Sequence, residues 1–294
     1  MDDNRQLVAQ FEEHRGHLRA VAYRMLGSAS EADDALQEAW LRVSRADTDE
    51  VQNMGGWLTT VVARVCLNML RSRKSRREEP LDTNVPDPII SRDDRSDPEQ
   101  EALLADSVGL ALLVVLETLT PPERLAFVLH DMFAVPFEEI GPIVDRSPEA
   151  ARQLASRARR RVRGGAAAPD VDLGRQREVV NAFFAAAREG NFEALVGVLD
   201  PDVVLRSDGG TARPSLSVLL RGAETVASRA VTFGRFAPDV RPAVVNGVAG
   251  AVVAPRGQAF SVMSFTVANG RIVAIDVLVD PDRLRPLDLS GLDD

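Results

Sequence analysis

The feature that most constrains the fold of this 294-residue chain is the change in its hydrophobic periodicity. In residues 7–73 and again in residues 101–163, apolar residues recur at the three- and four-residue spacing of amphipathic helices. Beyond Gly174, two further helical stretches are followed by short segments of strand type. The length allows two or three units with cores of their own. The sequence therefore predicts two all-α domains followed by an α+β domain.

Two segments rich in proline, glycine or acidic residues separate these domains. Residues 78–100 combine proline with acids and show little periodicity, which is typical of an extended linker. Residues 166–174 follow a Gly-Gly pair and form a second, shorter linker. We therefore expect three domains and a tail, at residues 1–77, 101–165, 175–284 and 285–294.

The charge is distributed unevenly. A net charge of −9 argues against a protein that coats nucleic acid by bulk attraction, because such proteins usually carry a basic surplus. Basic residues are nevertheless concentrated at 64–77 and 146–163. Two local anion-binding faces are therefore expected.

The composition, with 45% hydrophobic and 27% charged residues, is that of a soluble globular protein. No stretch approaches the roughly 18 uncharged apolar residues that a membrane span needs, and the acidic first residues do not resemble an export signal. We expect a cytoplasmic protein that does not contact membranes. The single cysteine, Cys66, lies among apolar residues and is interpreted as a buried packing residue.

Residues 28–43 (SASEADDALQEAWLRV) are expected to form a helix with two different faces, capped by Ser30. One face is apolar and comprises Ala32, Ala35, Leu36, Ala39, Trp40 and Val43. The other combines acids with an exposed leucine, and its candidate binding residues are Asp33, Asp34, Gln37, Glu38 and Leu41. Acids on a helix usually do no more than face solvent, so a solvated surface is the alternative to a protein-binding one.

Residues 55–77 (GGWLTTVVARVCLNMLRSRKSRR) form the first basic stretch. Helical spacing predicts a core side made of Trp57, Leu58, Val61, Val65 and Met69. The candidate DNA-contacting residues are Trp57, Thr60, Arg64, Asn68, Arg71, Arg73 and Lys74, followed by Arg76 and Arg77. Such side chains can contact the phosphates and unstacked bases of a melted strand. A basic helix that serves only solubility is an equal alternative on these residues alone.

The second basic stretch has the pattern of a helix-turn-helix. Thr120, Pro121 and Glu123 suit the start of a helix that should run to Met132. Residues 137–144 supply a short first helix, in which Pro142 predicts a kink or an early end. The recognition helix follows, and its candidate groove-contacting residues are Ser147, Arg152, Gln153, Ser156, Arg157 and Arg160. The alternative is a surface helix rich in arginine.

In the third domain we expect helices at 176–188 and 192–199 and a hairpin of residues 259–267 with 271–279, turned by Asn269-Gly270. Asp276 interrupts the apolar second strand of this hairpin. It could face a pocket as a base, but a structural or interface position is favoured. All three histidines precede the domain, and the sequence predicts no catalytic residue, metal site or cofactor.

The order of acidic helix, Trp57 and basic helix resembles regions 2.2 to 2.4 of the extracytoplasmic-function sigma factors, and residues 101–165 resemble their region 4. Residues 175–284 are similar to a SnoaL-like domain of the nuclear-transport-factor-two-like fold, which a subgroup of that family carries. The tail Asp280, Pro281, Asp282, Arg283 and Leu284 resembles the subgroup's Asn-Pro-Asp-Lys-Leu motif, from which Asp280 and Arg283 depart. Residues 85–88 (VPDP) are a loose version of its linker motif.

The resemblance implies an alternative sigma factor. The acidic helix would bind core RNA polymerase, the two basic regions would read the downstream and upstream elements of promoter DNA, and the third domain would regulate both. A small ligand in that domain is left open. The alternative is a helix-turn-helix repressor or activator with a ligand-sensing or catalytic domain, such as an isomerase or cyclase. The acidic face separates the two readings, because a repressor has no need of it.

Overall fold

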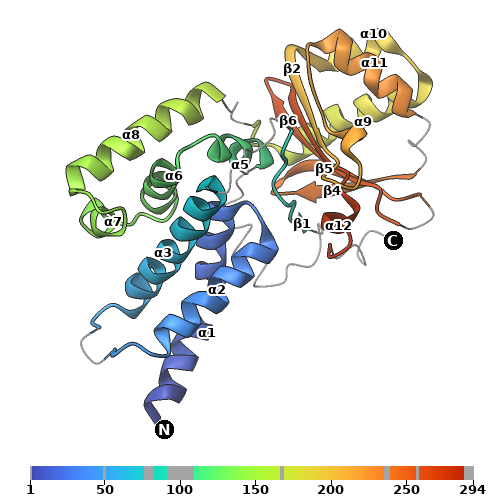
Figure 1. Ribbon diagram of the computed structural model, residues 1–294. Coiled ribbons are helices and arrows are strands. Elements are labelled where there is room, and N and C mark those ends of the chain that lie inside the picture. Colours follow the sequence, from blue (N-terminus) through green and yellow to red (C-terminus); the bar gives the residue numbers. More distant parts are fainter. Residues whose placement is uncertain are drawn as a thin grey trace. The chain divides into compact units, whose positions relative to one another are not determined.

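The fold is given by a computed structural model, which describes residues 2–48, 51–75, 83–91, 109–165, 169–234, 239–255 and 258–287 (Figure 1). The chain divides into two compact units. The first, the helical unit, contains the described residues 2–75 and 115–165. The second, the α+β unit, contains the described residues 83–91, 109–114 and 169–287. Among the described residues, no helix is both long enough and apolar enough to cross a bilayer.

The helical unit begins with three long helices that pack on one another, and its second half consists of shorter helices. The first three are α1 (Asp2–Leu26), α2 (Ala29–Val43) and α3 (Met54–Ser75). They are followed by α5 (Leu110–Glu117), α6 (Pro121–Phe127), a π-helical turn (Val128–Met132), α7 (Phe137–Ile143) and α8 (Pro148–Gly165). The division between the units falls within α5.

The helix-turn-helix pattern is confirmed. Thr120 and Glu123 form the expected capping box, and helical backbone continues to Met132, although its last turn is π-helical. The first helix of the motif, α7, includes Pro142 and ends at Ile143, one residue before the end of the expected range 137–144. The turn is tight, because a Cβ on Gly141 would lie 2.8 Å from the carbonyl oxygen of Arg146.

Two details of the first three helices correct the expectations. Ser28, not Ser30, caps α2, and its hydroxyl accepts a hydrogen bond from the amide of Glu31 at 3.4 Å. The cause is Gly27, whose positive φ of 73° ends α1 and leaves the next residue in the extended conformation of a cap.

The buried face of α3 is also rotated relative to the expectation. Trp57, Val61 and Met69 are only half-buried. Leu58 and Val65 are buried as expected, and the rest of the buried stripe comprises Val62, Ala63, Cys66, Leu67 and Leu70. Since α3 packs against both α1 and α2, its buried face is broad, and Trp57 lies at the edge of the exposed side.

The α+β unit contains, among its described residues, a seven-stranded sheet in the order β1-β4-β5-β6-β7-β2-β3. All neighbouring strands are antiparallel except β2 and β7, which are parallel. The strands are β1 (Ile90–Ser91), β2 (Leu199–Asp208), β3 (Val218–Arg221), β4 (Val240–Val245), β5 (Val248–Val253), β6 (Ser261–Ala268) and β7 (Arg271–Leu278). The helices are α9 (Leu173–Glu189), α10 (Phe192–Val198), α11 (Ala223–Phe233) and α12 (Pro281–Leu284), with a short 3₁₀ turn at Pro214–Leu216.

The core of this unit lies between the sheet and the helices α9, α10 and α11 (Figure 1). Its largest buried side chains include Phe183, Leu195, Phe265 and Ile275. The predicted hairpin is confirmed as β6 and β7, since Asn269 and Gly270 both have positive φ, at 54° and 72°. Part of the segment expected to be a linker is also structured, because β1 pairs antiparallel with β4 at one edge of the sheet.

Candidate functional site

The exposed face of α2 is the first candidate surface. Asp34, Gln37, Glu38 and Leu41 are all exposed, and Leu41 retains 50% of its accessible surface. Glu38 forms an i,i+4 ion pair with Arg42 at 2.9 Å. Asp33 differs from these four, because it is half-buried and accepts two hydrogen bonds from Arg19, the shorter at 2.7 Å. Asp33 therefore fastens α2 to α1 instead of standing free on the face.

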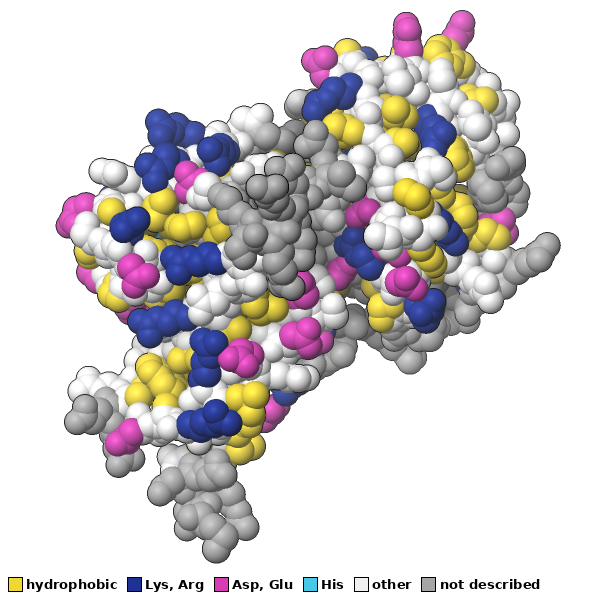
Figure 2. All heavy atoms as spheres, viewed as in Figure 1, with side chains coloured by type: hydrophobic (Ala, Val, Ile, Leu, Met, Phe, Trp, Pro, Cys, Tyr) yellow, Lys and Arg dark blue, Asp and Glu magenta, His cyan; other side chains and the backbone are white. Residues whose placement is uncertain are grey.

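The second candidate surface lies along α3. Arg64, Asn68 and Arg71 are exposed, and Trp57 and Thr60 are half-buried on the same side. Figure 2 shows Lys and Arg side chains lying near one another on the visible face of the helical unit. These five predicted residues therefore share one face of the helix.

Arg73, a further predicted residue of this stretch, stands apart from that face. Arg73 forms an ion pair with Glu31 and donates a hydrogen bond to the carbonyl oxygen of Leu26 at 3.3 Å. This arginine therefore joins α3 to α2 and to the end of α1. The side chain of Lys74, together with Arg76 and Arg77, lies outside the described residues.

The third candidate surface is the recognition helix α8. Ser147 caps it, since its hydroxyl accepts a hydrogen bond from the amide of Ala150 at 3.3 Å. The other predicted groove-contacting residues, namely Arg152, Gln153, Ser156, Arg157 and Arg160, are all exposed. The guanidinium of Arg152 lies 5.1 Å from the ring centroid of Phe137, so the Arg152 side chain packs against α7.

A buried carboxylate, Glu123, holds α8 in place. Its side chain is 6% exposed and accepts hydrogen bonds from the Nε atom of Arg157 at 3.1 Å and from an Nη atom of Arg161 at 3.0 Å. Thr120 donates to the same carboxylate from its amide and its hydroxyl. Desolvation opposes ionisation, but these hydrogen bonds and the two arginines hold the pKa of Glu123 below its ordinary value. The sequence indicated Glu123 only as a capping residue, and its contact with α8 was missed.

Two buried arginines join the halves of the helical unit, and sequence reasoning missed both. Arg24 on α1 and Arg124 on α6 are 2% and 3% exposed. The Nε atom of Arg124 donates to the carbonyl oxygen of Arg24 at 3.3 Å, and the guanidinium of Arg24 lies 5.0 Å from the centroid of the Phe133 ring. Burial lowers the pKa of Arg124 to about 10, so it remains charged at neutral pH.

In the α+β unit, Arg283 connects the tail to the structured part of the linker. Its Nε atom donates to Asp87 at 2.6 Å, and one Nη atom donates to Asp208 at 2.7 Å. The other Nη atom donates to the carbonyl oxygen of Val85, whose amide in turn donates to Asp208 at 3.0 Å. Burial alone would lower the pKa of Arg283, but Asp87 and Asp208 raise it above its ordinary value. We call Val85, Asp87, Asp208 and Arg283 the latch.

The surrounding residues hold the latch on both sides. Asp280 caps α12 by accepting a hydrogen bond from the amide of Asp282 at 2.9 Å, and Leu284 is buried. Pro281 occupies the first turn of α12. At the other side, Ile89 and Asn246 exchange two hydrogen bonds of 2.8 Å each. The predicted tail therefore meets the predicted linker motif, although its Lys position is an arginine.

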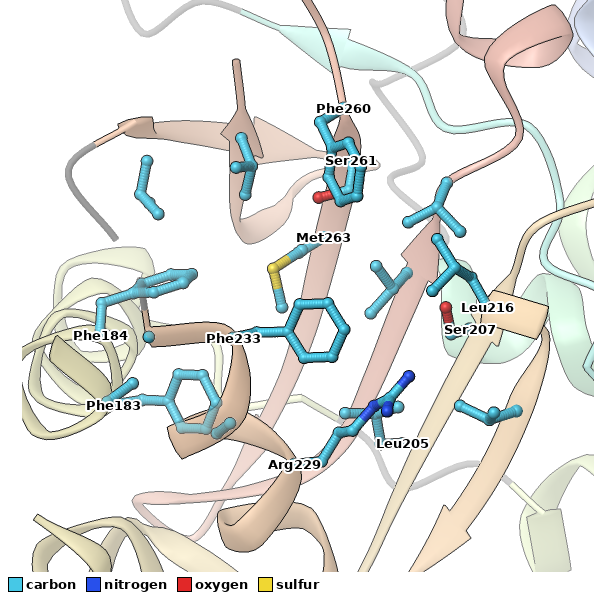
Figure 3. A pocket seen from close by; sticks show the side chains of 18 residues that line it. Phe183, Phe184, Leu205, Ser207, Leu216, Arg229, Phe233, Phe260, Ser261 and Met263 are labelled. Carbon is cyan, nitrogen blue, oxygen red and sulfur yellow. The ribbon is translucent and has the colours of Figure 1, made fainter. Parts of the chain in front are cut away.

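A cavity of about 120 Å³ lies in the same unit (Figure 3). Asp276 is absent from the eighteen described residues that line it, which corrects its placement at a possible pocket. Val277 and Val279 line the cavity, so strand alternation directs Asp276 to the opposite face of the sheet. There it is 1% exposed and pairs with Arg206 at 2.6 Å. Burial raises the pKa of Asp276, and Arg206 opposes this shift.

Comparison with known proteins assigns these surfaces to a family. Residues 10–76 match Sigma-70 region 2, and residues 109–162 match Sigma-70, region 4. The chain is 38% identical over 290 residues to the ECF RNA polymerase sigma factor SigJ of Mycobacterium tuberculosis (strain ATCC 25618 / H37Rv), across 94% of this chain and 92% of SigJ. It is 34% identical over 290 residues to "Probable ECF RNA polymerase sigma factor SigI" of Mycobacterium tuberculosis (strain CDC 1551 / Oshkosh), across 98% of both.

A solved structure extends the similarity to the fold. The crystal structure of the Mycobacterium tuberculosis extracytoplasmic function sigma factor SigJ matches with a TM-score of 0.76 at 34% identity, and the match covers 96% of this chain and 100% of that chain. The similarity thus includes the α+β unit as well as the two sigma regions. It sets aside the alternative of an ordinary helix-turn-helix repressor or activator. The chain belongs to the extracytoplasmic-function family of RNA polymerase sigma factors.

Proposed function

We propose that this protein is an alternative sigma factor whose α+β unit is a built-in, non-enzymatic regulator that acts through the linker. The observation that carries the proposal is the latch, in which Arg283 binds both Asp87 and the carbonyl oxygen of Val85. Residues 76–108 connect α3 with α5, and therefore join the two halves of the helical unit that are proposed to read the promoter. A unit that holds part of this connection limits how far the halves can separate.

The exposed face of α2 is proposed to bind core RNA polymerase in the cytoplasm. Asp34 and Glu38 are one helical turn apart on this face, beside the half-exposed Leu41. An exposed leucine framed by acids suits a protein interface with a charged rim. On the apolar face of the same helix, Trp40 is half-buried and the other residues are buried in the core, so the exposed face can bind without unfolding the helix.

Promoter DNA is proposed to bind at two places on the helical unit. The α3 face combines two exposed arginines with the half-exposed ring of Trp57, which suits phosphates and an unstacked base. The recognition helix offers Arg152 and Gln153, which have the chemistry for guanine and adenine edges in a major groove. Arg157 is already bound to Glu123, so we assign it to positioning α8 and to the backbone rather than to base reading.

The lining of the cavity supports regulation without catalysis. Among the eighteen described residues that line it, none is an aspartate, glutamate, histidine or cysteine. Proton transfer in a pocket of this kind would need such a group within hydrogen-bond reach of the substrate. The pocket is therefore proposed to bind a ligand, not to convert one.

The test of the proposed function is reconstitution with core polymerase. The parent should co-purify with core polymerase and direct initiation from a cognate promoter. The double variant Asp34→Arg/Glu38→Arg should bind core polymerase at least about tenfold more weakly, since a like charge replaces each acid at the interface. Glu13→Arg, a charge reversal at an exposed position of α1, is the matched control and should bind like the parent. Equal binding by the double variant and the parent would contradict the assignment of this face.

A further inference from the structure

The cavity of the α+β unit has an aromatic, apolar wall. It lies between the sheet and the helices α9 and α11, and Figure 3 shows the rings of Phe183, Phe184 and Phe233 around it together with Met263. Its volume of about 120 Å³ is close to that of engineered apolar cavities of about 150 Å³, which bind benzene. The space therefore fits a body the size of a single ring.

Two serine hydroxyls interrupt this apolar wall. Ser207 and Ser261 both line the cavity, and they are only 8% and 4% exposed. Within the described part of the chain, neither hydroxyl has a hydrogen-bond partner. A hydroxyl that faces a cavity can donate one hydrogen bond and accept others, so their position points to a ligand with oxygen or nitrogen atoms on this side.

Arg229 supplies the charge of the site. It is half-buried on α11, and its guanidinium lies 4.5 Å from the centroid of the Phe233 ring. It is the only charged side chain among the eighteen described residues of the lining, and within the described structure it has no carboxylate partner. A guanidinium in an apolar pocket without an acid favours a ligand that brings its own carboxylate.

We propose that this cavity binds a small aromatic monocarboxylate. The ring would lie among the phenylalanines and Met263, and the carboxylate would pair with Arg229 and accept a hydrogen bond from a serine hydroxyl. Neutral rings of the same size would bind more weakly, because they leave the guanidinium and the hydroxyls without an anion. Dicarboxylates would bind more weakly than monocarboxylates, since the eighteen described lining residues include no second cation.

The cavity and the latch share two strands, so the site also has a regulatory consequence, which rests on the proposed function of the latch. Ser207 in the cavity wall immediately precedes Asp208 of the latch, and Val279 in the wall immediately precedes Asp280. The amide of Val279 donates to the carbonyl oxygen of Asp208 at 2.8 Å. A ligand that moves either strand end would therefore move the groups that hold the linker.

The binding experiment uses full-length protein, without polymerase or DNA, and benzoate as the probe. Saturation-transfer NMR should show saturable one-to-one binding, with benzamide as the neutral, near-isosteric comparison. Arg229→Gln should weaken benzoate binding at least about tenfold, equivalent to about 1.4 kcal/mol, and leave benzamide binding unchanged. Met263→Phe should abolish both by filling the cavity. Arg221→Gln, an exposed arginine outside the lining, is the control and should bind like the parent.

Absence of saturable benzoate binding, or equal affinity of the parent and Arg229→Gln, would overturn the site. Circular dichroism of each variant confirms that the fold is retained. The proposed coupling between the cavity and the latch is tested separately. Saturating benzoate should change the rate of hydrogen exchange at residues 83–91. Unchanged exchange there would overturn the coupling. Because none of these readouts involves transcription, their failure is distinct from failure of the proposed sigma function.

Discussion

Replacing Arg283 with alanine is expected to release the linker segment from the α+β unit. The change removes a guanidinium that donates to Asp87 at 2.6 Å, to Asp208 at 2.7 Å and to the carbonyl oxygen of Val85. A hydrogen bond to a charged group contributes about 1.5–3 kcal/mol. Because the Arg283 side chain is 27% exposed and the bonds of one group are not additive, we expect a local loss of about 2–4 kcal/mol.

Native-state hydrogen exchange measures this loss directly. The amides of Val85 and Ile89 are bonded to Asp208 and to Asn246, so their exchange reports opening of the segment. A loss of 2–4 kcal/mol corresponds to exchange that is roughly 30- to 700-fold faster. With core polymerase, the same variant should direct more transcription than the parent, since the two promoter-reading halves can separate.

Arg285→Ala is the matched control for this prediction. Arg285 is only two residues further on, but it is exposed and pairs within α12 and its cap with Asp282 at 3.1 Å. Its loss should change exchange of the linker amides by less than about threefold, as expected for a surface ion pair. Arg283→Lys should be intermediate, because an ammonium cannot reproduce the fork that contacts two carboxylates. Equal effects of Arg283→Ala and Arg285→Ala, or no effect of either, would refute the latch.

Three further outcomes are expected. Arg152→Ala should relax discrimination between upstream promoter variants and cost roughly 1–3 kcal/mol, whereas Arg160→Ala should weaken all of them alike; footprinting of the holoenzyme decides, and unchanged discrimination would count against base reading. Folding lowers the pKa of Glu123 from its ordinary 4.5, so its stabilisation is present above that pH and lost as the pH falls below it; Glu123→Gln should therefore lower stability at pH 7 and flatten its decline in acid, as measured by urea unfolding at several pH values. Burial raises the pKa of Cys66 to about 12, so a thiol reagent at pH 8 should label it only in denaturant, and rapid labelling of the native protein would show that α3 opens.

The features that the sequence predicted correctly are those decided within a few residues. The capping box of Thr120 and Glu123 and the turn at Asn269-Gly270 depend on side chains that act on their own backbone. Helix-turn-helix and hairpin could therefore be placed without any knowledge of the surrounding fold.

The features that were missed depend on partners distant in the sequence. Strand β1 exists because Ile90 pairs with Val245, a residue of β4, and residues 83–91 themselves carry no strand periodicity. Likewise, helical spacing placed Trp57 on the core side of its helix, but with α3 packed against two helices Trp57 is only half-buried. Periodicity gives the angular spacing of a face, and tertiary packing decides which way that face points.

The arginines show that sequence can locate a basic surface but cannot tell which of its arginines are exposed to bind DNA and which hold the fold together. Exposed arginines of α3 and α8 were correctly expected on open faces. Arg124 and Arg283 have the same side chain, yet one is buried between helices and the other joins the tail to the linker. What separates them is the acid or carbonyl oxygen that each one meets, and those acceptors, such as Asp87 and Asp208, come from other parts of the chain. Helical spacing can indicate pairs within one helix, such as Glu38 with Arg42, but it carries no information on contacts between distant segments, on which the proposed regulation depends.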